Sequence, residues 1–447
     1  MTLVVCVDVG STYTKAAAVE LPSGVLVATA SHPTTIGTDV LIGLYAAVAA
    51  AAEGRAIDEL RVCSSAGGGL RLGVIGYERA ITAEAGWRVG LSAGARVVHV
   101  AAGILDQAAM AALAADRPDI VLLCGGTDGG DESVLQNATA LVESGFDKPV
   151  VVACNAKVAN TVGQRLTDAG IPATVTANVL PRIGVLDAMP ARLAIREAFI
   201  RHVIGGKELS QGPRFQELVS CATPDAVLAA VELLADGGPG EPGVGDVVVV
   251  DVGGATTDVY SALAPDADEP STEAVTTLWR GRTVEGDLGV RWNAVGIIAA
   301  AESEGLLSSN VAVLRSGAQM RAGDPAFLAG TDDERLLDLE LARLALTVAV
   351  RRHARPYDVP GGTRTKGRDL SRARLVVGSG GVLRHADGAA AGEVLAPLHA
   401  DVAGGWRLAE RAESVVDRDY VLAAAGLLAP DHPDAAMRLL RTSLLPD

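Results

Sequence analysis

The sequence predicts an α/β protein of two similar lobes, with an α/β insertion in the first lobe. Three segments carry this prediction, because each is a short apolar run that leads directly into glycine and hydroxyl residues. They lie at residues 3–15, 247–258 and 374–381. The first two place an aspartate, Asp8 or Asp251, at the end of the apolar run. The second half of the chain therefore repeats the sequence pattern of the first.

The first lobe is predicted over residues 1–205. Apolar runs bounded by turn residues indicate strands, and these are expected at residues 3–8, 14–20, 25–31 and 60–65, with a helix at 39–52. An insertion is predicted at about 74–169, because strands and helices alternate there for longer than a minimal lobe requires. Its strands are expected at 97–100, 120–123 and 150–153, and its helices at 105–115, 133–144 and 156–169.

The rest of the chain is predicted to connect the lobes, build the second lobe and return to the first. A helix at about 187–203 is interpreted as the interlobe helix, and residues 206–245 as a helix and a linker rich in glycine and proline. The second lobe is expected over 246–412. Residues 413–447 are predicted to be helices that return to the first lobe, beginning with one at about 413–428.

Composition excludes several classes of protein. The 38 Lys and Arg against 54 Asp and Glu give a formal charge of −16, which disfavours binding to nucleic acid or to an anionic membrane. Hydrophobic residues make up 49%, yet no apolar run approaches the roughly 20 residues that span a bilayer. No cationic segment precedes the first strand, so a signal peptide is not expected. The five widely spaced cysteines are typical of reduced core residues, and we expect a cytoplasmic protein.

The chemistry of the glycine-rich segments points to phosphate and a divalent cation. Two carboxylates, Asp8 and Asp251, can hold a hydrated Mg²⁺, because this hard cation prefers oxygen ligands and retains several waters. Glycines let backbone N–H groups approach phosphate oxygens, and Ser or Thr hydroxyls add donors. A strand that ends in Asp-Val-Gly can also be an ordinary turn, but its occurrence in both lobes favours a nucleotide clamp between them.

At these residues the chain resembles a known superfamily. DVGSTYTK at residues 8–15 resembles the first phosphate loop of the actin, sugar kinase and heat-shock chaperone ATPases, DVGGATTDV at 251–259 their second phosphate loop, and VVGSGGVL at 376–383 their adenosine loop. Within that superfamily the whole chain resembles the glutamate mutase accessory proteins of the MutL or GlmL type. Further support comes from LCGGTDGGDES at 123–133 and EGDLGVRWNA at 285–294.

The resemblance implies two ribonuclease-H-like lobes that bind ATP or ADP with Mg²⁺ in the cleft between them. It assigns Asp8 and Asp251 to Mg²⁺, largely through water, and Asp8, Asp251, Thr12 and Lys15 to catalysis. A solvated strand lysine is the alternative for Lys15. The expected phosphate contacts are Gly10, Ser11, Thr12, Gly253, Gly254, Thr256 and Thr257. The expected adenosine contacts are Gly378, Ser379, Gly380 and Gly381.

The resemblance also implies a task, namely slow ATP hydrolysis that reactivates an adenosylcobalamin-dependent mutase such as glutamate (methylaspartate) mutase. The partner would carry the cobalamin and this chain the ATP. Two alternatives on the same fold remain open, a small-molecule kinase and a polymerising actin-like protein. No G-x-x-x-x-G-K-[ST] loop occurs, which excludes a Walker-type NTPase.

Three further strings allow more than one interpretation. Asp128 and Asp131, in the Gly-rich string at 125–132, support a metal, contact a partner or cap the following helix. The loop at 285–289 transmits lobe closure or is a structural turn. Glu340 and Arg343 contact the nucleoside or form a solvated i, i+3 ion pair.

Overall fold

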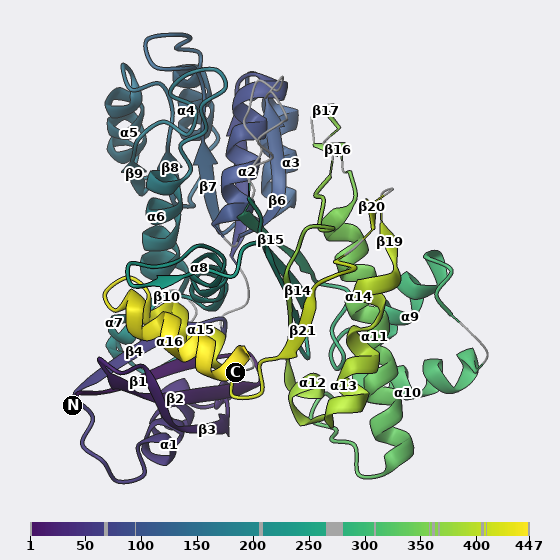
Figure 1. Cartoon of the computed structure of the whole chain (residues 1–447). Coiled ribbons are helices and arrows are strands. Elements are labelled where there is room, and N and C mark those ends of the chain that lie inside the picture. The colour runs from purple at the N-terminus through teal and green to yellow at the C-terminus, as the bar shows by residue number, and fades with distance from the viewer. Residues whose placement is uncertain are drawn as a thin grey trace.

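The computed structural model describes most of the chain, and Figure 1 shows its arrangement. The described residues are 2–66, 70–93, 95–204, 209–264, 280–307, 310–356, 358–359, 363–364, 367–403, 406–407 and 409–445. The predicted boundary at 205–206 lies outside them. None of the helices in this part of the chain is both long and apolar enough to cross a bilayer.

The first lobe is built on a five-stranded sheet in the order β10-β4-β1-β2-β3. Strand β1 pairs antiparallel with β2, which pairs antiparallel with β3, while β4 and β10 extend the other side in parallel. The strands are β1 (Thr2–Val9), β2 (Tyr13–Leu21), β3 (Val25–Pro33), β4 (Glu59–Ser64) and β10 (Val219–Ala222). Helix α1 (Val40–Ala52) covers one face and is capped by Asp39, whose side chain accepts a hydrogen bond from Leu41 N.

The second lobe repeats this topology in a sheet ordered β15-β14-β13-β18-β21. Antiparallel pairs join β13 to β14 and β14 to β15, and parallel pairs join β13 to β18 and β18 to β21. The strands are β13 (Val247–Val252), β14 (Thr257–Ala262), β15 (Arg280–Glu285), β18 (Leu375–Ser379) and β21 (Glu413–Val416). The matching order and directions confirm the prediction of an α/β protein with two similar lobes.

The fifth strand of each sheet corrects the sequence analysis. Residues 413–416 form β21 and not the start of a helix, and helix α15 begins only at Val421. Strand β10 likewise lies within 206–245, where the sequence analysis placed a helix and a linker. Both strands are four residues long, so their local pattern is weak, and pairing with distant strands determines their structure.

Two helices pass between the lobes and follow these fifth strands. Helix α8 (Thr223–Asp236) follows β10 and contacts β13 and β14 of the second sheet. Helix α15 (Val421–Leu428) follows β21 and contacts β1, β2 and β4 of the first sheet. The two helices also pack on each other, and α16 (Pro433–Leu444) packs on both.

The predicted interlobe helix at 187–203 is therefore wrong, because α8 has that position. The structure forms α6 (Met189–Ala198) and a π-helical segment, η2 (Phe199–Ile204), and α6 contacts β7, β8, β9 and β10. Only one face of α6 is buried, and Leu193 on the other face is 55% exposed. A helix between two sheets must be apolar on opposite faces, as α8 is.

The insertion forms a third sheet, ordered β6-β5-β7-β8-β9, in which every pair of strands is parallel. Its strands are β5 (Arg71–Gly76), β6 (Arg96–Ala102), β7 (Ile120–Leu123), β8 (Val150–Val152) and β9 (Ala173–Val175). Its helical elements are η1 (Arg79–Ala83), α2 (Glu84–Ser92), α3 (Gln107–Ala115), α4 (Val134–Glu143) and α5 (Ala159–Asp168). Helix α2 lies beside β15, so the insertion touches the second lobe (Figure 1).

The remaining elements cover the second sheet or are short. The longest is α11 (Asp332–Ala354), whose buried residues lie in the core of the second lobe and whose N-terminus has a capping box of Thr331 and Glu334. The other helices are α7 (Arg214–Leu218), α9 (Ala294–Ser303), α10 (Val311–Gly323), α12 (Gly381–His385), α13 (Gly388–Leu395) and α14 (Pro397–Ala400). Short paired strands are β11 (Gly237–Gly238), β12 (Glu241–Pro242), β16 (Asp358–Val359), β17 (Thr363–Arg364), β19 (Val402–Ala403) and β20 (Trp406–Arg407).

Strand alternation determines which side chains meet between the lobes. Successive side chains of a strand point to opposite faces. Val4 and Cys6 of β1 therefore join Val247 and Val249 of β13 in the core that includes α8 and α15. Asp8 and Asp251 continue these two rows at the ends of their strands. The same periodicity thus places both aspartates at the edge of the core shared by the two lobes.

Candidate functional site between two phosphate-type hairpins

The two predicted phosphate loops are hairpin turns of the same geometry. Gly10 N donates to Tyr13 O at 3.1 Å, and Gly253 N donates to Thr256 O at 2.9 Å. In the strands below these turns, Asp8 pairs with Lys15, and Asp251 pairs with Asp258. The turns face each other, since a Cβ built on Gly254 would lie 3.8 Å from Thr12 Oγ1.

The second hairpin has its carbonyl groups tied to the chain that follows β15. Gly253 O accepts from Val290 N at 3.1 Å, and Gly254 O accepts from Arg291 N at 2.9 Å and Trp292 N at 3.0 Å. Ala255 O accepts from Asn293 Nδ2 at 2.8 Å. In a trans peptide the C=O and the next N–H point in opposite directions.

The N–H groups of residues 254–256 consequently point away from this chain. No hydrogen bond from these three groups is formed within the described part of the protein. Successive N–H groups that point to one side form a concave site suited to an anion. This backbone arrangement can hold phosphate oxygens.

Asp8 is nearly buried and already accepts hydrogen bonds from Thr223, Lys15 and the Cys63 thiol. Its side chain is 6% exposed, and its Oδ1 accepts from the Thr223 hydroxyl at 2.5 Å. Its Oδ2 lies 3.4 Å from Lys15 Nζ. Thr223 is the first residue of α8, so the helix between the lobes contacts the predicted metal ligand directly.

Lys15 lies between the acidic groups of the two lobes. Burial lowers its pKa, but the opposing effects of Tyr420, Asp8 and Asp251 are larger, so the pKa is raised above its usual value. The ammonium is therefore charged at neutral pH. This environment contradicts the alternative of a solvated strand lysine, because the side chain is only 22% exposed.

Asp251 carries the clearest sign of an incomplete site. Its Oδ1 is buried and has no hydrogen-bond partner among the described residues. Burial raises the pKa of Asp251 to about 6, although the Lys15 charge lowers it, while Asp258, Asp8 and Asp417 raise it further. A buried carboxylate oxygen without a partner is costly, and a hydrated cation would satisfy it.

The residues present fit a hydrated Mg²⁺ better than a fully protein-bound cation. Within the described part of the chain, no group of three or more His, Cys, Asp or Glu could hold a metal. Two carboxylates at the ends of their strands suit an ion that retains most of its waters. Asp8 and Asp251 are the residues that would hold it.

Asp258 takes the position in the second hairpin that Lys15 takes in the first. It accepts from Arg282 Nη2 at 2.7 Å and from Thr256 Oγ1 at 3.2 Å. Both members of the Asp258–Arg282 pair are nearly buried, with side chains 12% and 6% exposed. Thr256 is therefore oriented by a buried ion pair, while Thr257 donates to Leu288 O at 2.6 Å inside the lobe.

The predicted adenosine loop at 378–381 contains glycines that the protein itself requires. A Cβ on Gly378 would lie 2.9 Å from Leu395, and Gly380 has a φ of +107° with Val252 O only 2.2 Å from its Cβ position. Side chains there would collide with protein before they met a ligand. Gly381 alone faces open space, and Ser379 is buried beside Asp251 in the parallel strand pair.

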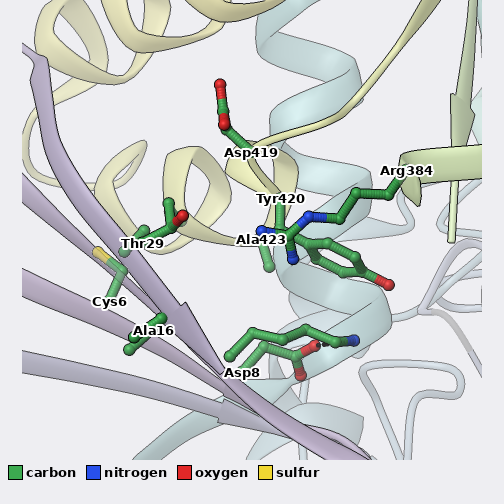
Figure 2. Close-up of a pocket in the computed structure, with 12 residues that line it drawn as sticks. Cys6, Asp8, Ala16, Thr29, Arg384, Asp419, Tyr420 and Ala423 are labelled. Carbon is green, nitrogen blue, oxygen red and sulfur yellow. Dashed lines mark hydrogen bonds and ion pairs between the residues drawn. The ribbon is translucent and has the colours of Figure 1, made fainter. Parts of the chain in front are cut away.

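Tyr420 is a site residue that the sequence analysis missed. Its ring lies 4.0 Å from Lys15 Nζ and 5.4 Å from the Arg384 guanidinium, measured to the ring centroid. Figure 2 shows the ring and Arg384 above Asp8, in a small cavity beside the first sheet. Its φ is +60°, a strained conformation for a residue with a side chain. A single tyrosine before a helix gives no signal of this in the sequence.

Asp225 lies in the first turn of α8, two residues after Thr223, and lines a separate small pocket with Ser64 and Arg196. Burial raises its pKa to about 6, against the charges of Arg196, Arg192 and Arg282. Arg282 belongs to the second lobe, so Asp225 lies near the charges of both lobes.

Two of the remaining candidate strings make hydrogen bonds and ion pairs within the protein. Asp128 accepts from Ala156 N and Asn178 Nδ2, both at 2.9 Å, and Asp131 accepts from Ser133 N at 2.8 Å. The structure therefore shows Asp131 capping the turn before α4. Glu340 and Arg343 form the i, i+3 ion pair at 2.6 Å.

Fold and site together define a two-lobed α/β protein with paired phosphate-type hairpins. The family model described as "MutL protein" matches residues 4–444, and the chain belongs to this family. Protein MutL of Clostridium tetanomorphum is 37% identical over 455 residues, and the match covers 98% of each protein.

Three solved structures give more distant likenesses. Nucleotide-free acetone carboxylase is 14% identical with a TM-score of 0.42, over 96% of this chain and 70% of the other. A glycerol dehydratase reactivase is 13% identical with a TM-score of 0.35, over 96% and 99%. A ROK family glucokinase from Streptomyces griseus with glucose and AMPPNP is 15% identical with a TM-score of 0.33, over 98% and 99%. The match to the MutL family, which spans almost the whole chain, is the stronger finding.

Proposed function

We propose that this protein binds Mg-ATP between its lobes and hydrolyses it slowly. The observation that carries the proposal is the convergence of two equivalent hairpins, with Asp8, Lys15 and Asp251 between them. Each hairpin supplies donors to phosphate oxygens, Ser11 and Thr12 from the first lobe and the N–H groups of 254–256 from the second. Mg²⁺, when bound, would supply positive charge to the β- and γ-phosphates.

Residues of both lobes have separate roles in the proposed hydrolysis. Asp8 and Asp251 would hold the hydrated metal, and Lys15 would stabilise negative charge that moves off the γ-phosphate. Hydrolysis in this scheme relies on positioning and electrostatic stabilisation and uses no covalent nucleophile.

We propose further that ATP drives the reactivation of an adenosylcobalamin-dependent mutase in the cytoplasm. Membership of the MutL family supports this assignment. For the nucleotide to drive a partner, ATP and ADP must bind the open and closed arrangements of the lobes with different affinities. Helices α8 and α15, which contact both lobes, would transmit such a change.

One set of ATPase assays tests the proposal. Phosphate release is measured for the protein alone, with candidate sugars and acids, and with a cobalamin mutase whose cofactor has been inactivated, using Asp8→Ala as the matched control. We expect the inactivated mutase to stimulate turnover and to regain activity only with ATP and the unaltered protein. ADP formation that depends on a small substrate would indicate a kinase, and ATP-dependent sedimentation would indicate a polymer. Either result without mutase reactivation would contradict the proposal.

A further inference from the structure

The segment at residues 285–293 connects the second hairpin to the insertion. At one end, backbone N–H groups of this segment and the Asn293 amide hold the carbonyls of residues 253–255. Asn293 Nδ2 also donates to Gly286 O at 2.8 Å, which closes the segment on itself. A Cβ on Gly289 would lie 2.3 Å from Ala255, so the two backbones are in direct contact. Movement of the segment would therefore move the hairpin.

The other end of the segment lies against the insertion. Nη1 of Arg96, the first residue of β6, lies 3.3 Å from the Cβ position of Gly286. Helix α2 of the insertion packs on β15, the strand that leads into the segment. The positive charge of Arg96 also acts on Asp287 and contributes to its lowered pKa, after the larger effects of burial, which raises it, and of Arg352.

Arg352 of α11 fixes the segment from the second lobe. It donates to Glu285 Oε2 at 2.7 Å and to the Asp287 carboxylate at 2.8 and 3.0 Å. The acidic end of the segment therefore meets two arginines, one in its own lobe and one in the insertion. Within the described part of the chain Arg352 donates hydrogen bonds to these carboxylates and Arg96 donates none, so Arg96 is the contact that can change when the insertion moves.

We propose that the 285–293 segment couples the insertion to the second phosphate hairpin, with Arg96 as the contact on the insertion and Asn293 as the positioning residue at the hairpin. This inference rests on the proposed nucleotide site and concerns its regulation. Nucleotide bound to the N–H groups of 254–256 favours one position of the segment, and that position favours one arrangement of Arg96 and α2. The coupling is reciprocal, so a protein bound to the insertion changes the affinity for ATP.

The test measures nucleotide affinity and hydrogen exchange separately. The full chain is titrated with ATP and Mg²⁺ by calorimetry, and amide exchange in α2 and β6 is followed with and without nucleotide. Arg96→Gln is compared with Lys157→Gln, which removes another basic group of the insertion, one paired with Glu132 at 2.6 Å. Asn293→Asp keeps the side-chain shape and removes the donor.

In the unaltered protein and in Lys157→Gln, we expect Mg-ATP to slow exchange in α2 and β6. In Arg96→Gln the slowing of exchange by Mg-ATP should disappear. ATP affinity should change by less than about 5-fold, which is the lower limit of typical allosteric effects on affinity. Asn293→Asp should lower ATP affinity about 10-fold, because the Ala255 carbonyl loses its hydrogen bond and the N–H groups of 254–256 lose their orientation. Protection that persists in Arg96→Gln, or that is absent in the unaltered protein although ATP binds, would overturn the coupling. Failure of the unaltered protein to bind ATP would instead overturn the nucleotide site on which the coupling depends.

Discussion

The two hairpins share one backbone geometry and differ in what holds them. The first turn carries the exposed side chains of Ser11 and Thr12. A backbone hydrogen bond from Thr34 N to Thr12 O, at 2.9 Å, ties this turn to the chain that follows β3. The second turn consists of small residues, and four hydrogen bonds from residues 290–293 hold its carbonyls. The first hairpin thus offers hydroxyl groups, while the second offers oriented backbone N–H groups.

The charges beneath the turns differ in the same way. Lys15 in the first hairpin pairs with Asp8 of its own lobe and its charge also acts on Asp251 of the other, whereas Asp258 at the equivalent position pairs with Arg282. A repeated topology therefore does not imply repeated roles. One hairpin supplies a cation that can respond to a ligand, and the other is held by internal bonds. Three pairs of substitutions would test this comparison.

The largest effect is expected for the paired aspartates. Asp8→Ala and Asp251→Ala should each lower Mg-dependent ATP turnover by about 100-fold or more, the usual result of removing a group that stabilises charge in a transition state. Circular dichroism and thermal unfolding should remain close to those of the unaltered protein, because each side chain lies at the end of its strand. Turnover near the original rate in both variants would exclude the proposed metal site.

The next effect distinguishes the equivalent positions 15 and 258. Asp258→Asn removes the buried carboxylate that pairs with Arg282 and should lower the free energy of unfolding by about 3–5 kcal/mol. Lys15→Met should change it by only about 1 kcal/mol, since this pair is partly exposed and 3.4 Å apart, and should instead weaken ATP binding. Urea unfolding and calorimetry provide the two measurements. Equal losses of stability would show that the positions have the same role.

The smallest effect concerns the space between the turns. A methyl group on Gly254 would meet no atom closer than 3.7 Å, so Gly254→Ala should change the free energy of unfolding by about 0.5 kcal/mol or less. The methyl group lies beside Thr12, where phosphate is proposed to bind, and we expect ATP affinity to fall about 10-fold, or 1.4 kcal/mol. Gly10→Ala serves as a contrast, because its Cβ would approach Tyr13 O at 2.7 Å and should also cost stability. Unchanged affinity in Gly254→Ala would remove this position from the site.

The sequence predicted most of the strands that carry the hairpins and the alignment of the two aspartates. Both follow from local rules, because apolar runs with a period of two determine which face Asp8 and Asp251 occupy. The errors occurred where distant parts of the chain decide the outcome. Strand β21 exists because β18 pairs with it, and α8 replaced the predicted interlobe helix because both of its faces meet a sheet.

The site residues that were missed share a physical reason. Thr223 and Tyr420 reach Asp8 and Lys15 from more than 200 residues away in the chain, so no local spacing relates them. The strained φ of Tyr420 and the buried oxygen of Asp251 are also properties of the folded chain. Sequence patterns identify the residues that lie at strand ends, but only the folded structure shows which distant residues contact them.

The crossed packing of α8 and α15 has a consequence for the origin of this architecture. Each half of the molecule contributes a helix that packs on the sheet of the other half, as the subunits of a domain-swapped homodimer do. If the chain arose by duplication, its single-lobed ancestor would have been stable only as a pair. Neither half could then have drifted into an independent protein, because each would expose the apolar surface that its neighbour's helix covers.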